Sequence, residues 1–319
     1  MISVLVTGAA TPLGEKIVRS LLADLRVSHV IATGFPGQVF PVTHAKRLSY
    51  LPLDLARARR VHEVLFGPAR DAAVEVVLHL GQPRDTYSRG RRAYDGDVES
   101  LRSILDLSDR HPSIRRVVVA SHAVVYRVSL DLPVLVTEDH PLDLDPSAPQ
   151  YVRDRVEADL TACARMGLAD CEIVVLRCAE ALAPGCGSQL YDFLAAPIAL
   201  RSIGFDPMVN VATVDDLVDA FLRATFGSGE GVFNIPGADT LPLSEAARKW
   251  GTPSIPAFGA LISRAYELRH RLTGSQFSYG MSRRRMHLGL VLDGTRAKKE
   301  LDYTPQHGVD WPVGGRPRG

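Results

Sequence analysis

The opening of the chain constrains its fold most, because an apolar run leads through a glycine-containing turn into a helical pattern. Residues 3–6 have the pattern of a buried strand. The turn over residues 7–14 reads TGAATPLG, and residues 15–25 carry apolar side chains at helical spacing. Backbone N–H groups and the helix dipole at such a junction can hold a pyrophosphate. We therefore expect nucleotide-site geometry here, with Gly8 permitting the sharp turn and Gly14 a close approach of helix and strand. An ordinary strand–helix loop is the alternative.

The same alternation of apolar runs and helical patterns continues along the chain. Strands are predicted at 3–6, 30–32, 51–53, 74–80, 116–121 and 173–176, and helices at 15–25, 57–66, 98–107, 156–164 and 214–225. Strands without polar alternation are buried on both faces, which is typical of a parallel sheet covered by helices. The order predicts an α/β fold, a Rossmann-type doubly wound parallel sheet with right-handed crossovers.

Glycine and proline become frequent beyond residue 183, and the periodicity weakens there. We interpret residues 1–182 as a dinucleotide-binding Rossmann domain to which residues 205–226 return. Residues 183–204 and 227–319 are predicted to form a smaller C-terminal α/β substrate lobe.

Composition narrows the classes of partner and site. The net charge of +1 gives no global field for nucleic acid, so we expect none to bind. Neither a signal-peptide pattern nor an apolar run of about 18 residues is found, which favours a cytoplasmic protein. The four cysteines, at 163, 171, 178 and 186, form no CxxC pair, so we expect reduced thiols and no metal site.

Further segments resemble one known family in the same order along the chain. The turn TGAATPLG is similar to the TGAxGxxG turn of the extended short-chain dehydrogenase/reductase superfamily, which includes nucleotide-sugar epimerases and dehydratases. The remaining matches are LDL at 53–55, VLHLG at 77–81, VVASHAVVY at 118–126, YVRDR at 151–155, IVVLR at 173–177, VDD at 214–216, GVFNI at 231–235 and the closing segment at 292–305. This order covers nearly the whole chain.

The resemblance implies that the glycine turn and three neighbouring segments bind NAD or NADP, with the form undecided. In the family, the aspartate that Asp54 matches contacts adenine. The cofactor-binding residues implied are Thr7, Gly8, Ala10, Thr11, Pro12, Leu13, Gly14, Asp54, Leu55, Leu80, Gly81 and Arg155.

The resemblance also implies an acid–base site. Tyr151 matches the tyrosine that exchanges a proton with substrate, although it could instead be an aromatic packed at a helix start. Arg155 replaces the neighbouring lysine and could supply its positive charge, or could lie on the surface. His122 stands where the catalytic serine or threonine usually stands, with Ser121 one residue earlier and on the opposite side of the strand. His122 could be a substitute acid or orienting group, or could fill the pocket.

Several positions depart from the family pattern. Thr11 replaces the middle glycine, Gly34 stands where NAD-preferring members place an acid, with no arginine or lysine beside it, and Asp97 replaces a structural asparagine. Together with Arg155 and His122, these departures touch pyrophosphate, ribose, proton relay and substrate oxygen. We predict an NAD(P)-binding protein with weak or lost ordinary catalysis and a nucleotide-sensing or interaction role.

Two alternatives stay open. One is an active epimerase, dehydratase or reductase that acts on a sugar nucleotide or a hydrophobic secondary alcohol. The other is a partner-binding protein whose nucleotide pocket is empty. The family resemblance also implies a homodimer, formed here through residues 98–107 and 156–164.

The segment 264–285 is strongly basic, with six arginines and one acid, Glu267. It could bind substrate phosphates or an anionic membrane surface. The alternative is a charged, solvated face over a core-packed helix, since apolar residues recur at helical spacing over 258–272.

Overall fold

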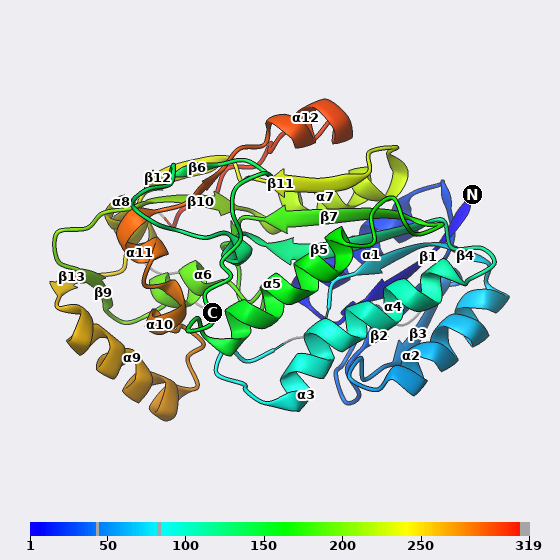
Figure 1. The fold of residues 1–319 in the computed structure, drawn as a ribbon, viewed down its shortest axis with the longest axis horizontal. Helices are drawn as coiled ribbons and strands as arrows, with labels where there is room; N and C mark the ends of the chain where they lie inside the picture. The colour runs from blue at the N-terminus through cyan, green and yellow to red at the C-terminus, as the bar shows by residue number, and fades with distance from the viewer. Residues whose placement is uncertain (43–44, 82–83, 313–319) are drawn as a thin grey trace.

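A seven-stranded parallel sheet forms the centre of the molecule in the computed structural model, which describes residues 1–42, 45–81 and 84–312. The sheet has the order β11-β7-β5-β4-β1-β2-β3 (Figure 1). Its strands are β1 (Ile2–Thr7), β2 (Val27–Gly34), β3 (Leu48–Pro52), β4 (Val74–His79), β5 (Arg116–His122), β7 (Glu172–Cys178) and β11 (Gly231–Ile235). The strand order reverses between β1 and β4, where doubly wound sheets bind ligands at the carboxyl ends of their strands.

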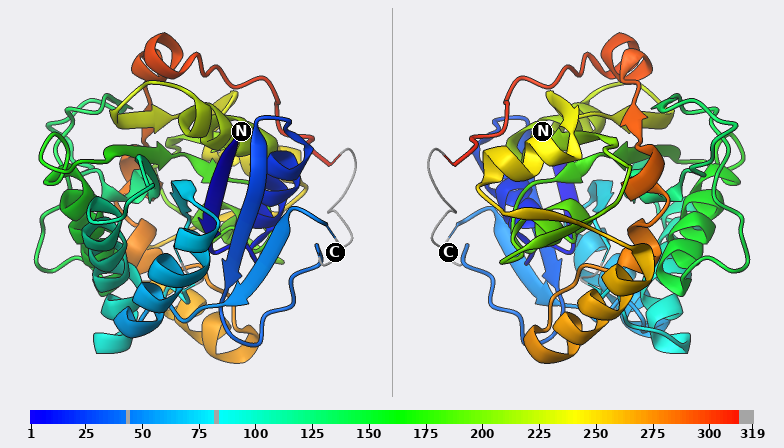
Figure 2. Two further views of the ribbon diagram at one scale, coloured as in Figure 1. Left: turned by 90° about the vertical axis from the view of Figure 1, so that its right-hand side faces the viewer. Right: turned by 90° about the vertical axis from the view of Figure 1, so that its left-hand side faces the viewer.

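Helices cover both faces of this sheet (Figures 1 and 2). Helices α1 (Pro12–Ala23) and α7 (Val214–Phe226) pack together on one face, and α2 (Ala58–Val64), α4 (Ser100–Asp109) and α5 (Gln150–Cys163) on the other. Each layer has a buried apolar cluster, one around Ile17 and Phe221 and the other around Leu65 and Ile104. The predicted doubly wound α/β fold is confirmed.

Except for α12 (Thr295–Leu301), which packs against β11 and α7, the remaining elements lie beyond the carboxyl ends of the main strands (Figure 1). A three-stranded sheet joins β8 (Glu180–Ala181), β10 (Met208–Ala212) and β12 (Asp239–Pro242), and the pairs β9 (Ala199–Ser202) with β13 (Ser254–Ala257) and β6 (Leu135–Val136) with β14 (Val291–Leu292) are parallel. The helices are α6 (Gln189–Leu194), α8 (Leu243–Trp250), α9 (Gly259–Thr273), α10 (Tyr279–Ser282), α11 (Arg285–Leu288) and α12 (Thr295–Leu301). A third apolar cluster, which includes Phe193, Trp250 and Phe277, holds this region together.

Two short irregular segments occur in this part of the molecule, one before α4 and one after β5. The short helix α3 (Arg91–Tyr94) continues through a π-helical turn at Asp95–Glu99 into α4, and a 3-10 turn at Ala123–Val125 follows β5. Helix α5 begins at Gln150, before the predicted start at residue 156, so Tyr151 lies in its first turn. In the described ranges, no helix is both long and apolar enough to cross a bilayer.

The interpretation of residues 258–272 as a core-packed helix is wrong for most of its apolar residues. Of the α9 stripe, Ile262 is buried, but Phe258, Leu261, Leu268 and Leu272 are 70%, 59%, 57% and 75% exposed. The helical period was correct, but the stripe faces solvent, because the buried side of α9 is formed by Ile262 and Tyr266.

Candidate active site

The turn between β1 and α1 is a tight bend that requires glycine at two positions. Gly8 has φ +68°, and a Cβ on it would lie 2.3 Å from the carbonyl oxygen of Gly81, two residues after the end of β4. A Cβ on Gly14 would lie 2.4 Å from the Gly8 carbonyl oxygen. The segment after β4 and the start of α1 therefore both lie close against this bend, as a phosphate-binding turn requires.

Thr11, the first departure from the family pattern, is the N-cap of α1. Its Oγ1 accepts a hydrogen bond from the Gly14 N–H at 3.1 Å and donates one to the Gly8 carbonyl at 2.8 Å. Pro12 follows at the first helical position, where its missing N–H costs nothing. The threonine therefore stabilises the turn internally, with an extended backbone that needs no glycine.

At Gly34, the second departure, a tyrosine on the neighbouring strand occupies the space that a side chain would need. The Tyr50 hydroxyl lies 2.4 Å from the point where a Gly34 Cβ would stand, and Ala10 Cβ lies 2.9 Å from the same point. The Tyr50 ring stacks on Phe40 with centroids 4.8 Å apart. Its hydroxyl oxygen is buried and has no hydrogen-bond partner among the described residues. Burial raises the pKa of Tyr50.

The predicted adenine end lies at the carboxyl end of β3. Asp54 is buried, accepts a hydrogen bond from the Ala56 N–H at 3.2 Å, and pairs with Arg57 at 3.3 Å and Arg92 at 3.7 Å. Beside it, a cavity of about 630 Å³ is lined by residues from β3, α2 and the segment after β2, including Phe35. Leu55 is buried next to Asp54. This cavity is large enough to receive a purine ring system.

Tyr151 lies against two guanidinium groups. The guanidinium carbon of Arg155 is 5.2 Å from the ring centroid, and that of Arg84 is 5.3 Å away. Arg84 Nη1 bonds Asp97 at 2.5 Å and Asp154 at 2.7 Å, while Arg155 Nη2 lies 3.8 Å from the other oxygen of Asp97. Asp97 thus bridges both arginines, and two carboxylates balance two cations beneath the tyrosine.

Arg155 is not the surface residue of the alternative interpretation, since its side chain is 23% exposed. Its Nε is buried and has no hydrogen-bond partner among the residues described. The same holds for Arg84 Nε. Both groups are donors that a ligand beside Tyr151 could use.

Thr7 and His79 form a buried pair below this cluster. Thr7 Oγ1 lies 3.0 Å from His79 Nδ1, at the carboxyl ends of β1 and β4. Burial, with the nearby charge of Arg155, lowers the pKa of His79 to about 4, so the imidazole is neutral at pH 7. The pair joins the two strands at the switch point of the sheet.

Ser121 and His122 contact different neighbours, as the alternation of a strand predicts. Ser121 Oγ donates to Asp159 Oδ2 at 2.5 Å, and Asp159 in turn pairs with the buried Arg177 at 2.6 Å. Ser121 is therefore held by a buried ion pair on α5 and β7. It also lines a small cavity together with Arg155.

His122 presents a neutral imidazole to the other side. Its Nδ1 accepts a hydrogen bond from the Val124 N–H at 3.0 Å, which places the ring proton on Nε2. Nε2 lies 3.9 Å from Glu180 Oε2. Burial lowers the pKa of His122 to about 4 despite the opposing charge of Glu180. His122 can therefore donate a hydrogen bond from Nε2 to an acceptor oxygen.

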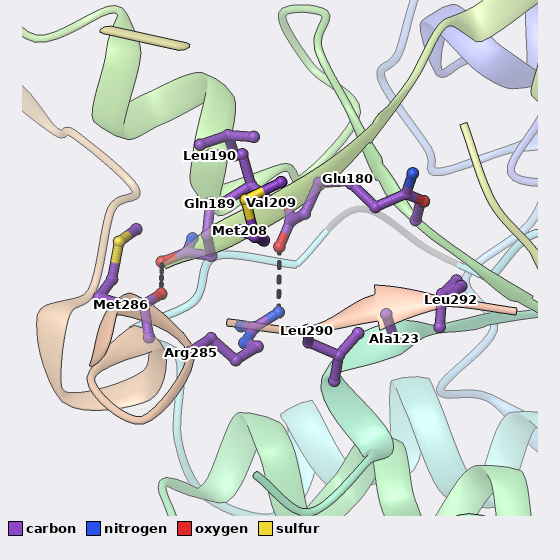
Figure 3. Close-up of a pocket in the computed structure, with 13 residues that line it drawn as sticks. Ala123, Glu180, Gln189, Leu190, Met208, Val209, Arg285, Met286, Leu290 and Leu292 are labelled. Carbon is purple, nitrogen blue, oxygen red and sulfur yellow. Dashed lines mark hydrogen bonds and ion pairs between the residues drawn. The ribbon is translucent and has the colours of Figure 1, made fainter. Parts of the chain in front are cut away.

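Glu180 also pairs with Arg285 at 3.1 Å across a half-enclosed cavity (Figure 3). Burial alone would raise the pKa of Glu180, but the charges of His122, when protonated, and Arg285 outweigh it and lower that pKa. Glu180 Oε2 and Arg285 Nη2 are both buried, and neither has a hydrogen-bond partner in the described part of the chain.

Three neighbouring cavities follow the boundary between α5 and the α10–α11 segment. One of about 120 Å³ is lined by Tyr151, one of about 250 Å³ by Val124 and Val152, and one of about 50 Å³ by Glu180. The first two share Pro149 and Gly280, and the last two share Arg285. They form a run of cavities that begins at the candidate acid–base residue.

Comparison with known proteins adds the following. A scan against models of protein families finds no match. An uncharacterised protein of Mycobacterium tuberculosis (strain ATCC 25618 / H37Rv) is 28% identical over 319 residues, covering 95% of this chain and 80% of its own. An uncharacterised protein of Mycobacterium bovis matches with the same figures.

Solved structures match over nearly the whole chain. The dTDP-glucose 4,6-dehydratase of Bacillus anthracis in complex with NAD has a TM-score of 0.68 at 17% identity and covers 98% of this chain and 94% of its own. The UDP-glucose 4-epimerase of Thermotoga maritima with UDP-glucose has a TM-score of 0.70 at 15% identity, covering 96% and 94%. The chain has the fold of the extended short-chain dehydrogenases/reductases.

Among proteins with this extended fold, another similar structure is the UDP-glucuronic acid 4-epimerase of Bacillus cereus in complex with UDP-glucuronic acid and NAD. It has a TM-score of 0.69 at 16% identity and covers 96% of this chain and 95% of its own. At these identities the extended dehydrogenase/reductase fold is shared, and the chemistry of the site depends on this chain's own residues.

Sequence reasoning missed four residues of the site, Tyr50, Arg84, Glu180 and Arg285. Arg84 could have been found from Asp97 and Asp154, because two buried acids call for more than one cation. Arg285 was noted only as part of a basic stretch; Arg284 pairs with Asp143 at 3.4 Å and Asp145 at 2.7 Å, so this part of the stretch is engaged within the protein. No local signal pointed to Tyr50 or Glu180.

Proposed function

We propose that this protein is a dinucleotide-dependent oxidoreductase in which Tyr151 exchanges a proton with the substrate. The observation that carries the proposal is the arrangement of Tyr151 between Arg84 and Arg155, both held by Asp97. A buried network with balanced charges is costly to maintain unless the geometry is well satisfied. Its presence at the tyrosine supports a working acid–base group.

The residues of the glycine turn would hold the dinucleotide. Gly8, Thr11 and Gly14 form a bend that would receive the pyrophosphate, and the buried Asp54 would contact the adenine end. The similar solved structures in complex with NAD support an NAD-type cofactor, and NAD and NADP are equal candidates. A bound dinucleotide would supply the hydride acceptor or donor for the substrate's carbinol carbon.

The chain's own groups would handle the proton. As the hydride leaves an alcohol, the Tyr151 oxygen takes the hydroxyl proton, and carbonyl reduction reverses both transfers. The Nε2–H of His122 is a donor for the substrate oxygen. Arg155 supplies a permanent positive charge beside Tyr151, which the developing phenolate needs.

The non-catalytic interpretation stays a prediction, and one experiment separates it from this proposal. Purified protein is screened for turnover of secondary alcohols, ketones and sugar nucleotides with each dinucleotide. We expect turnover that Tyr151→Phe lowers by at least about 100-fold, with the unfolding midpoint unchanged because the ring remains. Complete absence of turnover with bound dinucleotide, or equal rates in Tyr151→Phe, would favour the sensing role.

We further propose that α9 contacts an anionic membrane surface. Its exposed apolar stripe of Leu261, Leu268 and Leu272 is flanked on the same helix by the exposed Arg264 and Arg271. An apolar stripe with arginines at its edge suits the boundary between acyl chains and anionic headgroups.

The division into a Rossmann domain and a substrate lobe stays a proposal. A homodimer formed through α4 and α5 also stays a proposal.

A further inference from the structure

The smallest of the three cavities has a mostly apolar wall, whereas a sugar ring needs polar partners for its hydroxyl groups. Figure 3 shows it between α6, β10, the α11 segment and β14, with aliphatic side chains on both sides. The apolar residues that line it most closely are Leu190, Met208, Val209, Met286, Leu290 and Leu292. The described elements thus offer a ligand mostly methyl and methylene groups here.

The side-chain amides of two polar residues on the wall already have hydrogen-bond partners within the protein. The Asn210 amide donates to the carbonyls of Gly237 and Asp239 and accepts from the Gly237 N–H at 3.0 Å. Gln189 donates to the Gln276 carbonyl at 2.9 Å and accepts from the Ser278 N–H at 2.7 Å. These amides are used to hold the surrounding loops together and offer little to a ligand.

Two buried polar atoms on the wall, Glu180 Oε2 and Arg285 Nη2, have no hydrogen-bond partner among the residues that the structure describes. One accepts and the other donates a hydrogen bond, and the two side chains are paired with each other at 3.1 Å. A single hydroxyl group can satisfy both atoms, because it accepts from Arg285 and donates to Glu180, whereas a ketone oxygen can accept from Arg285 only. A pyranose would bring several hydroxyl groups against aliphatic walls, and each buried hydroxyl without a partner is unfavourable.

We propose that this cavity binds the apolar arm of a substrate with a single polar head, so that the substrate is a hydrophobic secondary alcohol or its ketone and not a sugar nucleotide. The inference rests on the proposed oxidoreductase function for its chemistry. The cavity of about 50 Å³ has room for about four water-sized groups at 10–15 Å³ each. The arm is therefore short, about four carbons.

A homologous series of methyl ketones tests the proposal directly. Acetone, 2-butanone, 2-pentanone, 2-hexanone, 2-heptanone and 2-octanone are titrated into the full chain, and binding is followed by saturation-transfer NMR. We expect affinity to rise by about fourfold for each added methylene and to level off once the arm reaches about four carbons. UDP-glucose, titrated in the same way, should neither bind more tightly nor displace the ketones.

Two variants place the binding in this cavity. Met286→Gln changes a wall residue that is only partly buried, and Leu268→Gln changes an exposed residue of α9 outside the cavity. Met286→Gln should weaken 2-hexanone binding several-fold while Leu268→Gln leaves it unchanged, with circular dichroism confirming that both are folded. Affinity independent of chain length, tight UDP-glucose binding, or equal effects of both variants would overturn the proposal.

The outcome is separable from that of the proposed function. Length-dependent ketone binding without turnover of any alcohol would leave the substrate class standing and reject catalysis by Tyr151. Turnover of UDP-glucose that Tyr151→Phe abolishes, without ketone binding, would do the reverse.

Discussion

Asp97 carries the charge balance beneath Tyr151, since its two oxygens face Arg84 and Arg155. Asp97→Asn would leave two largely buried guanidinium groups with one carboxylate, Asp154. We expect the free energy of unfolding to fall by about 3 kcal/mol, as in other broken buried pairs. Urea denaturation measures this.

The matched control is Asp106→Asn on helix α4, which removes a half-exposed partner of Arg165. Surface pairs of this kind contribute up to about 1 kcal/mol. Equal losses in the two variants would contradict a special role for Asp97.

Gly34 and Tyr50 also act as a pair. Gly34→Asp places a Cβ 2.4 Å from the Tyr50 hydroxyl, so we expect a marked loss of stability. Tyr50→Phe combined with Gly34→Asp removes the clashing oxygen and supplies a carboxylate for the ribose hydroxyls. The double variant should recover part of the lost stability, because Ala10 Cβ still lies 2.9 Å from the new Cβ, and it should bind NAD about tenfold more tightly than Gly34→Asp alone, measured by thermal unfolding and calorimetry. No recovery would mean that Tyr50 does not limit position 34.

For single residues, the sequence showed which positions depart from the family pattern: Thr11, Gly34, Asp97 and Arg155. It did not show which residues of the same chain these side chains contact. Thr11 caps a helix, Gly34 makes room for Tyr50, and Asp97 joins Arg155 to Arg84. The partners lie on other strands and loops, so periodicity and motif spacing could not reveal them. Each of these departures therefore has a structural partner within the chain.

Helices and strands were the most predictable part of the molecule, because buried parallel strands have continuous apolar runs. Segments at 3–6, 74–80 and 116–121 all fall on observed strands. Helix α9 was the failure at this scale, since an apolar period does not say whether its stripe faces the core or solvent.

The exposed stripe of α9 leads to a prediction for this element. Leu268→Glu should reduce co-sedimentation with vesicles of phosphatidylcholine and phosphatidylglycerol, because a buried carboxylate opposes insertion and anionic headgroups repel it. Leu168→Glu, at an 83% exposed leucine after α5, is the matched control and should leave binding unchanged. Equal binding of both variants, or of wild type to pure phosphatidylcholine, would exclude anionic-surface contact through α9.

The stability of the whole molecule should depend on pH through His79, which is buried, and His122, which is partly buried. Burial lowers the pKa of His79 and of His122 from the unfolded value of 6.5 to about 4. The unfolded chain then binds more protons between these values, so stability is fully present above pH 6.5 and is lost as pH falls to 4. Each histidine contributes about 3 kcal/mol to that loss.

The free energy of unfolding, measured by denaturant titration from pH 7 to pH 4, checks this dependence. His122→Asn should show a shallower decline than wild type, since one of the two groups no longer titrates. An identical slope in the two proteins would mean that His122 is already protonated in the folded state near pH 6.

The central claim is that the bend at Gly8 holds a dinucleotide beside Tyr151. Calorimetric titration with NAD⁺, NADH, NADP⁺ and NADPH tests it most directly. Wild type should bind at least one of the four saturably, one per chain. Gly8→Ala should weaken that binding by at least about tenfold, because its Cβ would meet the Gly81 carbonyl oxygen at 2.3 Å. Absence of binding by wild type to all four, or unchanged binding by Gly8→Ala, would contradict the claim.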